Sequence, residues 1–315
     1  MAGTNGRHLM EKTLLRVRGD GVELAVYRWG NPRGVPVLLV HGYPDNHRTW
    51  LPLVNALADE FQVFAYDVRG CGASDKPRGY RHYRLRHLGR DLEAVLRAIS
   101  PSRPVHLVAH DWGSIQAWET VTEPHCAPLL ASYTSISGPC LDHVGHWMRN
   151  ALRQPGRRWA ALGQLLHSWY IAFFHLPWLP ELSWRLGMAR LWPSLIRRLE
   201  GVTPDANPCQ LADGCNGVQL YRANFFRSLT RPRQRTTQVP VQLIVPTRDL
   251  FVRPALFEEL PRWTEQLQVR EVPAGHWRLL IEGKALATWV REFVRQREGA
   301  LSAEPAARKR VGQVG

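Results

Sequence analysis

Val105-His-Leu-Val-Ala-His-Asp-Trp-Gly-Ser114 is the most informative segment of the chain. An apolar strand-like run is followed at once by a turn of the pattern small-x-acid-x-small, and a helical pattern begins directly after it. Such a turn strains the backbone of its central residue, so the residues two before and two after it must be small. Ala109 and Gly113 meet this requirement. The segment therefore has the form of a nucleophile elbow centred on Asp111, and we expect Ser114 to point into the helix.

An aspartate at the centre of this turn determines the class of reaction. A carboxylate attacks an sp3 carbon by displacement and leaves an alkyl ester on the enzyme, and water then attacks the ester carbonyl. Asp is also common just before a helix, where it caps the N-terminus. Because the partners described next accompany it, we predict that Asp111 is a nucleophile.

Hydrolysis of such an ester needs a general base for the water and a buried acid that holds the base in the right tautomer. Asp249 stands in the loop after the strand-like run that begins at Val241, and His276 stands just after the next such run. Nucleophile, acid, base is the chain order of this arrangement. The sequence has 13 histidines, and only the position after the last strand singles out His276. Asp249 could otherwise simply cap a loop.

An oxyanion hole is the third requirement, and backbone N–H groups fixed before reaction can provide it. The run His41-Gly-Tyr-Pro44 follows an apolar strand-like segment, and its glycine permits a tight turn. We predict that the N–H groups of Tyr43 and Trp112 are the two donors. The same run could also be only a turn that ends a strand.

The chain as a whole alternates strand-like and helix-like segments, which predicts an α/β fold with a mostly parallel central sheet and helices on both faces. A helical apolar spacing spans 85–99, and a last helix is expected from about Trp277 to Arg297. The strand-like runs lie at 22–29, 35–40, 62–66, 105–109, 131–137, 239–245 and 268–272.

One stretch departs from this alternation. Between about Cys140 and Arg235 the chain is rich in Trp, Leu, Arg and Pro, and short helical patterns are broken at prolines. We predict an α/β-hydrolase core at 1–139 and 236–298, an inserted helical cap at 140–235, and a flexible tail at 299–315.

The formal net charge of +14 comes almost entirely from arginine. An excess of arginine can attract nucleic acid or anionic membranes, and it can equally reflect an arginine-rich proteome. No recognition motif or basic helical stripe accompanies it, so no nucleic-acid partner is expected. Oligomeric state is left open.

Five scattered cysteines, an odd number without metal-like spacing, predict free thiols in a reducing compartment, with neither a disulfide nor a zinc site. The N-terminus lacks the apolar core of a secretory signal, and no window holds the roughly 18 apolar residues of a membrane-spanning helix. Cytoplasmic residence is the expectation.

Four motifs together resemble those of soluble epoxide hydrolases of the α/β-hydrolase superfamily, over about residues 22–294. The similarity is greatest to hydrolase domains that some bacterial chains carry fused to a short-chain dehydrogenase, and we expect no such second domain here. The resemblance implies an epoxide and water as substrates, a vicinal diol as product, and no metal or cofactor. The motifs are His41-Gly-Tyr-Pro44, Asp67-Val-Arg-Gly-Cys-Gly-Ala-Ser-Asp-Lys-Pro77, His110-Asp-Trp-Gly113 and Gly275-His-Trp277.

In that family two cap tyrosines donate hydrogen bonds to the epoxide oxygen. The segments Ser168-Trp-Tyr-Ile-Ala-Phe-Phe174 and Gln219-Leu-Tyr-Arg222 resemble the two motifs. The resemblance therefore implies that Tyr170 and Tyr221 are the donors, although either could be a packed aromatic. The apolar side chains of the cap favour a small apolar epoxide.

Two alternatives stay open. Haloalkane dehalogenases share much of this skeleton and use the same nucleophile. Many of them carry a halide-binding asparagine where Tyr43 stands, and fluoroacetate dehalogenases carry arginine where Trp112 stands, so these departures favour the epoxide. The tryptophan-rich cap could still hold a halide ligand. A non-catalytic binding protein of the same fold is the second alternative, supported only by the basic charge.

Overall fold

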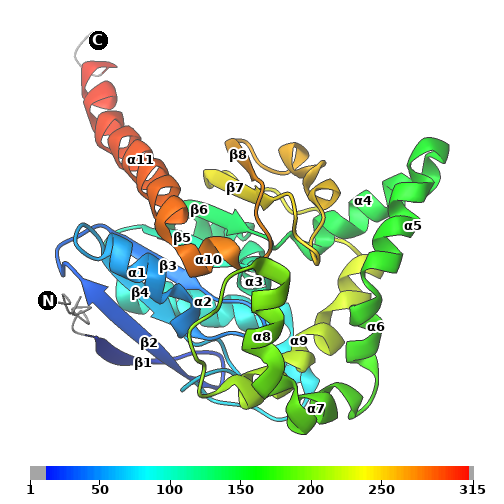
Figure 1. The fold of residues 1–315 in the computed structure, drawn as a ribbon. Helices are drawn as coiled ribbons and strands as arrows, with labels where there is room; N and C mark the ends of the chain where they lie inside the picture. The colour runs from blue at the N-terminus through cyan, green and yellow to red at the C-terminus, as the bar shows by residue number, and fades with distance from the viewer. Residues whose placement is uncertain (1–11, 312–315) are drawn as a thin grey trace, which may run out of the picture.

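A single sheet of eight strands, in the order β1-β2-β4-β3-β5-β6-β7-β8, runs through the molecule (Figure 1). The computed structural model describes residues 12–311. β2 is antiparallel to both of its neighbours, and all later pairs are parallel. The predicted α/β fold with a mostly parallel sheet is confirmed. The strands are β1 Thr13–Arg18, β2 Glu23–Gly30, β3 Pro36–Val40, β4 Gln62–Tyr66, β5 Val105–His110, β6 Leu130–Ile136, β7 Val241–Pro246 and β8 Leu267–Val272.

Helices cover both faces of the sheet. Leu88 and Leu92 of α2 and Trp118 of α3 belong to one buried apolar cluster, whereas Leu57 of α1 and Val290 of α11 belong to a second cluster. β3, β5, β6 and β7 are buried along their whole length, as expected for strands covered on both faces. The core helices are α1 Leu51–Leu57, α2 Leu85–Ile99, α3 Trp112–Val121, α10 Arg278–Glu282 and α11 Lys284–Val311.

Helices also fill the connection between β6 and β7. They form the body on the right and lower right of Figure 1, and all of them lie within the segment 140–235 that the sequence predicts as a cap. Among the described residues none of the helices, in the cap or elsewhere, has the length and apolar character that crossing a membrane requires. The cap helices are α4 Leu141–Arg153, α5 Arg158–His167, α6 Trp169–His175, α7 Leu179–Ser183, α8 Ala189–Glu200 and α9 Gln210–Thr230.

The structure differs from the sequence-based expectations at both ends of the fold. β1 was not predicted, because it is an edge strand whose side chains are mostly exposed or half-buried. The expected last helix is divided at Gly283, which has a positive φ of 67°, into α10 and α11. α11 continues to Val311, and the flexible tail at 299–315 stays a prediction.

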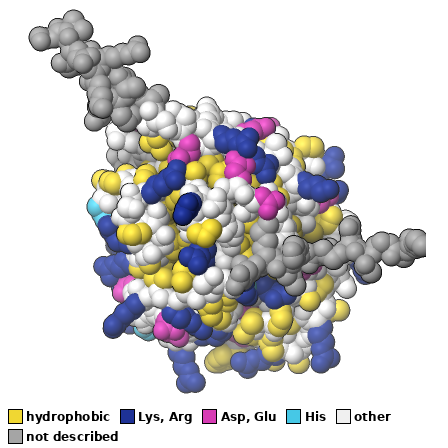
Figure 2. Space-filling view, turned by 90° about the vertical axis from the view of Figure 1, so that its left-hand side faces the viewer, with side chains coloured by type: hydrophobic (Ala, Val, Ile, Leu, Met, Phe, Trp, Pro, Cys, Tyr) yellow, Lys and Arg dark blue, Asp and Glu magenta, His cyan; other side chains and the backbone are white. Residues whose placement is uncertain are grey.

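Positive charge is scattered over one face of the molecule (Figure 2). Figure 2 views the face that lies on the left in Figure 1, and dark-blue Lys and Arg side chains are scattered across it and around its outline, with Asp and Glu between them. Such a face does not offer a continuous basic track to a nucleic-acid backbone.

A buried ion pair fastens the loop after β4 to α2. The Arg69 guanidinium donates from Nε and Nη2 to the two carboxylate oxygens of Asp91, at 2.6 and 2.7 Å, and both side chains are buried. The remaining Arg69 donors reach the carbonyl oxygens of His82 and Asp20. This bidentate geometry orients the loop that carries Asp67-Val-Arg69 against the sheet.

Removing the acid of this pair is expected to destabilise the fold strongly. Asp91→Ala leaves the Arg69 charge buried without a partner, so the free energy of unfolding should fall by about 3–5 kcal/mol. Arg97→Ala, which breaks only an exposed pair with Glu93, should cost about 0.5 kcal/mol. Urea unfolding midpoints measure both values, and a loss below about 1 kcal/mol for Asp91→Ala would contradict the assignment.

Candidate active site

Asp111 lies in the sharp turn between β5 and α3. Its φ of 50° and ψ of −123° are unusual for a residue with a side chain, and its N–H donates to the carbonyl oxygen of Ile136 at 3.0 Å. A Cβ at Gly113 would lie 2.3 Å from the carbonyl oxygen of Val40, so only glycine lets α3 approach β3 this closely. Asp111 occupies the N-cap position, but its side chain makes no capping hydrogen bond.

Ser114 is turned away from this turn, as its sequence position predicts. Its hydroxyl lies 2.6 Å from the Tyr133 hydroxyl and 2.8 Å from Ser135 Oγ, and it donates to the carbonyl oxygen of Gly138. The serine therefore anchors α3 to β6 inside the core.

Two backbone amides meet the Asp111 carboxylate. The Tyr43 N–H donates to Asp111 Oδ2 at 2.8 Å, and the Trp112 N–H lies close enough to help lower the pKa of this carboxylate. A Cβ at Gly42 would lie 2.5 Å from Asp111 Oδ2, so glycine is what allows the loop after β3 to come this near. The residues predicted as oxyanion donors therefore lie where an ester carbonyl on Asp111 would meet them.

Asp249 and His276, from the loops after β7 and β8, come together beside Asp111. His276 Nδ1 lies 2.7 Å from Asp249 Oδ2, and His276 Nε2 lies 3.8 Å from Asp111 Oδ1. The other oxygen of Asp249 accepts from the N–H groups of Phe251 and Val252. The Asp249 carboxylate thus orients the His276 imidazole, whose Nε2 faces Asp111.

The electrostatics of these three groups are linked. Burial raises the pKa of Asp111 to about 6, although the His276 charge and the two amides partly offset the effect. Burial alone would lower the pKa of His276, but the Asp249 carboxylate, assisted by Asp111, raises it to about 9. Burial also works against charge on Asp249, yet His276 and the N–H groups of Val252 and Phe251 lower the pKa of Asp249. The two carboxylates thus favour the imidazolium form of His276.

An apolar cavity of about 280 Å³ opens at Asp111 between the cap and the core. Tyr170 of α6 and Tyr221 of α9 line it, with ring centroids 6.2 Å apart in an edge-to-face arrangement. Burial and the Asp111 charge raise the pKa of both phenols, so both hydroxyls keep their protons at neutral pH. Further lining residues include Trp112, Leu141, Val144, Met148, Phe225 and Phe251.

Glu200 at the end of α8 is a buried contact that sequence reasoning missed. It accepts from the backbone N–H of His276 at 2.8 Å and from that of Arg278 at 3.3 Å. A Cβ at Gly275 would lie 2.1 Å from Glu200 Oε2, which explains the glycine before the histidine. The cap thus helps to place the imidazole. No sequence signal points to Glu200, because it stands in no recognised motif and meets His276 only through packing between cap and core.

Asp45 is a second buried acid that sequence reasoning missed. Burial, with a contribution from the Asp111 charge, raises the pKa of Asp45 to about 7, and Trp277 Nε1 donates to its carboxylate at 3.0 Å. Its proximity to the motif His41-Gly-Tyr-Pro44 was the available signal.

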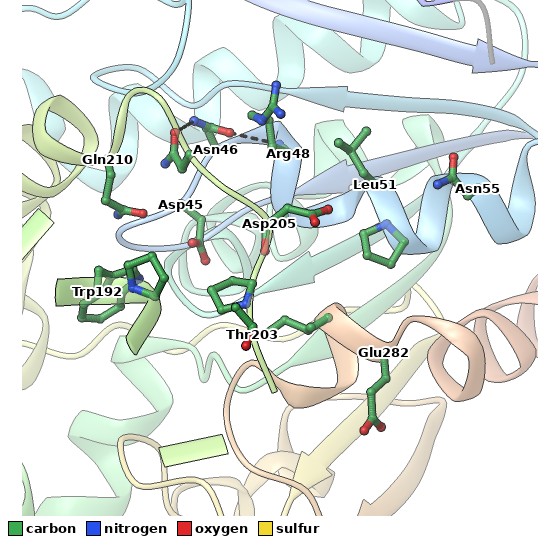
Figure 3. A pocket seen from close by; sticks show the side chains of 16 residues that line it. Asp45, Asn46, Arg48, Leu51, Asn55, Trp192, Thr203, Asp205, Gln210 and Glu282 are labelled. Atoms are coloured by element: carbon green, nitrogen blue, oxygen red, sulfur yellow. Dashed lines mark hydrogen bonds between the residues drawn. The ribbon is translucent and has the colours of Figure 1, made fainter. Parts of the chain in front are cut away.

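Asp45 also lines a second cavity, of about 420 Å³, whose walls are largely polar. In the view of Figure 3, the segment carrying Thr203 and Asp205 lies between Trp192 on one side and Leu51 on the other. The cavity at Asp111 has mainly apolar walls, so an apolar substrate fits that one better.

Curated proteins of known name resemble this chain over most of its length. The probable oxidoreductase EphD of Mycobacterium tuberculosis is 35% identical over 305 residues, which cover 93% of this chain and 51% of that relative. The chain thus spans about half the length of that protein. Epoxide hydrolase 3 of Mus musculus is 26% identical over 275 residues, which cover 83% of this chain and 71% of the relative.

Solved structures show the same fold. The crystal structure of an epoxide hydrolase of Bacillus megaterium in complex with an inhibitor matches with a TM-score of 0.74 at 21% identity, covering 89% of this chain and all of that one. The family model described as alpha/beta hydrolase fold matches residues 35–282. This match covers most of the chain, from β3 to α10, and includes the loops that carry Asp111, Asp249 and His276. The chain therefore belongs to the α/β-hydrolase fold family.

Proposed function

We propose that this protein hydrolyses an apolar epoxide to a vicinal diol through an alkyl ester on Asp111. The observation that carries the proposal is the position of the Asp111 carboxylate, which lies at an apolar cavity, beside two backbone donors, and 3.8 Å from His276. Similarity to proteins named epoxide hydrolases supports it. Cytoplasmic residence belongs to the same proposal, supported by five free cysteines.

The first step is ring opening. The ionised Asp111 carboxylate attacks one epoxide carbon from the side opposite the oxygen, and a new C–O bond forms as the ring C–O bond breaks. The oxygen that leaves takes a proton from Tyr170 or Tyr221, which line the cavity beside Asp111. The product is a hydroxyalkyl ester and a tyrosinate.

The second step releases the diol. Ester formation removes the Asp111 charge, which is one of the groups that raise the pKa of His276, so the imidazolium becomes a stronger acid and can return its proton to the tyrosinate. Neutral His276 then takes a proton from water, and the hydroxide attacks the ester carbonyl. The Tyr43 and Trp112 amides stabilise the oxyanion, and the imidazolium protonates the departing alkoxide, which leaves Asp111 as a carboxylic acid. His276 then takes the proton of this acid, which restores the ionised nucleophile and the imidazolium.

The cap tyrosines favour an epoxide over a haloalkane. An alkoxide needs an acidic donor as it leaves, and two phenols at the cavity can supply one, whereas a halide needs no proton. Many dehalogenases carry a halide-binding asparagine at the position of Tyr43. Here the Tyr43 hydroxyl instead accepts a hydrogen bond from Trp184 Nε1 at 2.8 Å, so this side chain does not supply the amide that binds a halide. The assembled triad also weighs against a non-catalytic role.

Substitution of the nucleophile and of the base should separate the two steps. With styrene oxide as probe, Asp111→Ala should form no diol, because no ester can form. His276→Gln should accumulate protein heavier by the mass of one epoxide, because ester hydrolysis loses its base. Intact-protein mass spectrometry measures the adduct. Turnover at the wild-type rate in either variant would refute the assignment.

Removing the phenol hydroxyls should slow ring opening. Tyr170→Phe and Tyr221→Phe should each lower the single-turnover rate of ester formation by about 10- to 100-fold, and the double variant by more. Tyr80→Phe, at an exposed tyrosine of the core, is the control and should change nothing. A chloroalkane and bromoalkane panel runs in parallel. Halide release that survives the double substitution would identify a dehalogenase instead.

Ester formation should depend on pH through Asp111. The nucleophile is the ionised form, and its raised pKa of about 6 means that this form is lost as the pH falls through 6. The single-turnover rate should therefore be constant from pH 7 to 8 and decline about tenfold per unit below 6. Acid-quench measurements provide the rate. A rate that is unchanged between pH 7 and 5 would contradict the Asp111 assignment.

A further inference from the structure

The helix α5 of the cap carries its apolar stripe on the outside. Trp159, Leu162 and Leu166 follow the spacing i, i+3, i+7 of one helix face, and their exposed fractions are 80%, 42% and 78%. The inward positions Ala161 and Gln164 are buried instead. An amphipathic helix of a water-exposed protein normally buries such a stripe. This helix presents it to the surroundings.

The exposed apolar surface continues along the chain. Trp169 at the start of α6 is 69% exposed, and Trp178, just before α7, is 81% exposed. Leu179 beside it is exposed as well. α5, α6 and α7 follow one another down the right-hand outer edge of the molecule in Figure 1. We call Trp159, Leu162, Leu166, Trp169, Trp178 and Leu179 the cap ridge.

The backbone at Trp178 adds to this observation. Its φ is 59°, a left-handed conformation that bulky residues rarely adopt. A glycine or asparagine there would relieve the strain, yet the chain holds an indole there, almost completely in solvent. Strained positions of this kind cluster at functional sites.

The cap is also strongly basic. Residues 140–235 contain 13 arginines and no lysine, against five acidic residues. Several of the arginines are exposed and make no ion pair with any described residue. These are Arg149, Arg153, Arg158, Arg185, Arg190, Arg197 and Arg198.

We propose that the cap ridge docks onto an anionic membrane surface. Exposed tryptophans and leucines insert into the interfacial region of a bilayer, and exposed arginines of the same cap attract anionic headgroups. A second copy of this chain is the poorer partner, because apposed ridges would bring the unpaired arginines of two chains of charge +14 together. Charge therefore favours the lipid surface.

Docking would place the catalytic cavity at the membrane. Trp169 belongs to the cap ridge and also lines the cavity at Asp111, so the ridge borders the mouth of that cavity. An apolar epoxide dissolved in the bilayer would then enter without crossing water, a consequence that rests on the proposed function. The docking itself does not depend on any activity.

Vesicle binding tests the docking. The purified chain is sedimented with vesicles of phosphatidylglycerol mixed with phosphatidylcholine, and with vesicles of phosphatidylcholine alone, at about 0.15 M ionic strength. Wild type should bind the anionic vesicles and bind the neutral ones at least about tenfold more weakly. The ridge variant Trp159→Gln, Leu166→Gln and Trp178→Gln should lose at least about tenfold in affinity for the anionic vesicles.

Matched variants distinguish binding through the cap ridge from non-specific hydrophobic binding and from binding through net charge alone. Leu14→Gln with Val269→Gln removes exposed apolar side chains outside the cap and should bind as wild type. Arg153→Gln with Arg158→Gln should weaken binding, whereas Arg33→Gln with Arg78→Gln should not.

Circular dichroism spectra and unchanged diol formation from styrene oxide in solution would show that each variant is folded. Wild-type binding by the ridge variant, or no binding of the native chain to anionic vesicles, would overturn the proposal. A ridge-dependent dimer in sedimentation velocity, without vesicle binding, would overturn it in favour of a second copy.

Discussion

The Asp111 carboxylate is buried under the cap, and it must still be ionised to react. The other features of the site depend on the contacts that keep it ionised. Burial raises the pKa of this group and so favours its protonated form. The Tyr43 and Trp112 amides and the His276 imidazole oppose that effect and hold the pKa near 6. The result is a carboxylate with little water around it, which is a better nucleophile than a hydrated one.

The same three groups acquire new roles once the carboxylate becomes an ester. The amides that stabilise the resting charge face the carbonyl on which charge next develops, so no rearrangement is needed. The imidazole loses a neighbouring negative charge and gives up its proton more readily. Glu200 belongs to the cap, and its carboxylate accepts a hydrogen bond from the backbone N–H of His276 in the core. Cap and core therefore both contribute to the site.

The middle of the sheet was largely predictable from sequence because β3, β4, β5 and β7 are short, mostly apolar runs. β4 and α2 begin and end where the sequence places them, and Asp111, Asp249 and His276 follow strands whose positions were predicted. β1 was not, since an edge strand with exposed side chains lacks the apolar run that signals burial. Contacts such as Glu200 with His276 could not be found, because side-chain packing between cap and core leaves no periodic signal.

The transfer of oxygen in a single turnover tests the central claim most directly. With the protein in excess over styrene oxide, in water labelled with heavy oxygen, attack by Asp111 predicts that the first diol carries no label and that the label appears in the Asp111 side chain. Peptide mass spectrometry locates it. Label in the first diol, with Asp111 unlabelled, would show that water opens the ring directly and would contradict the account.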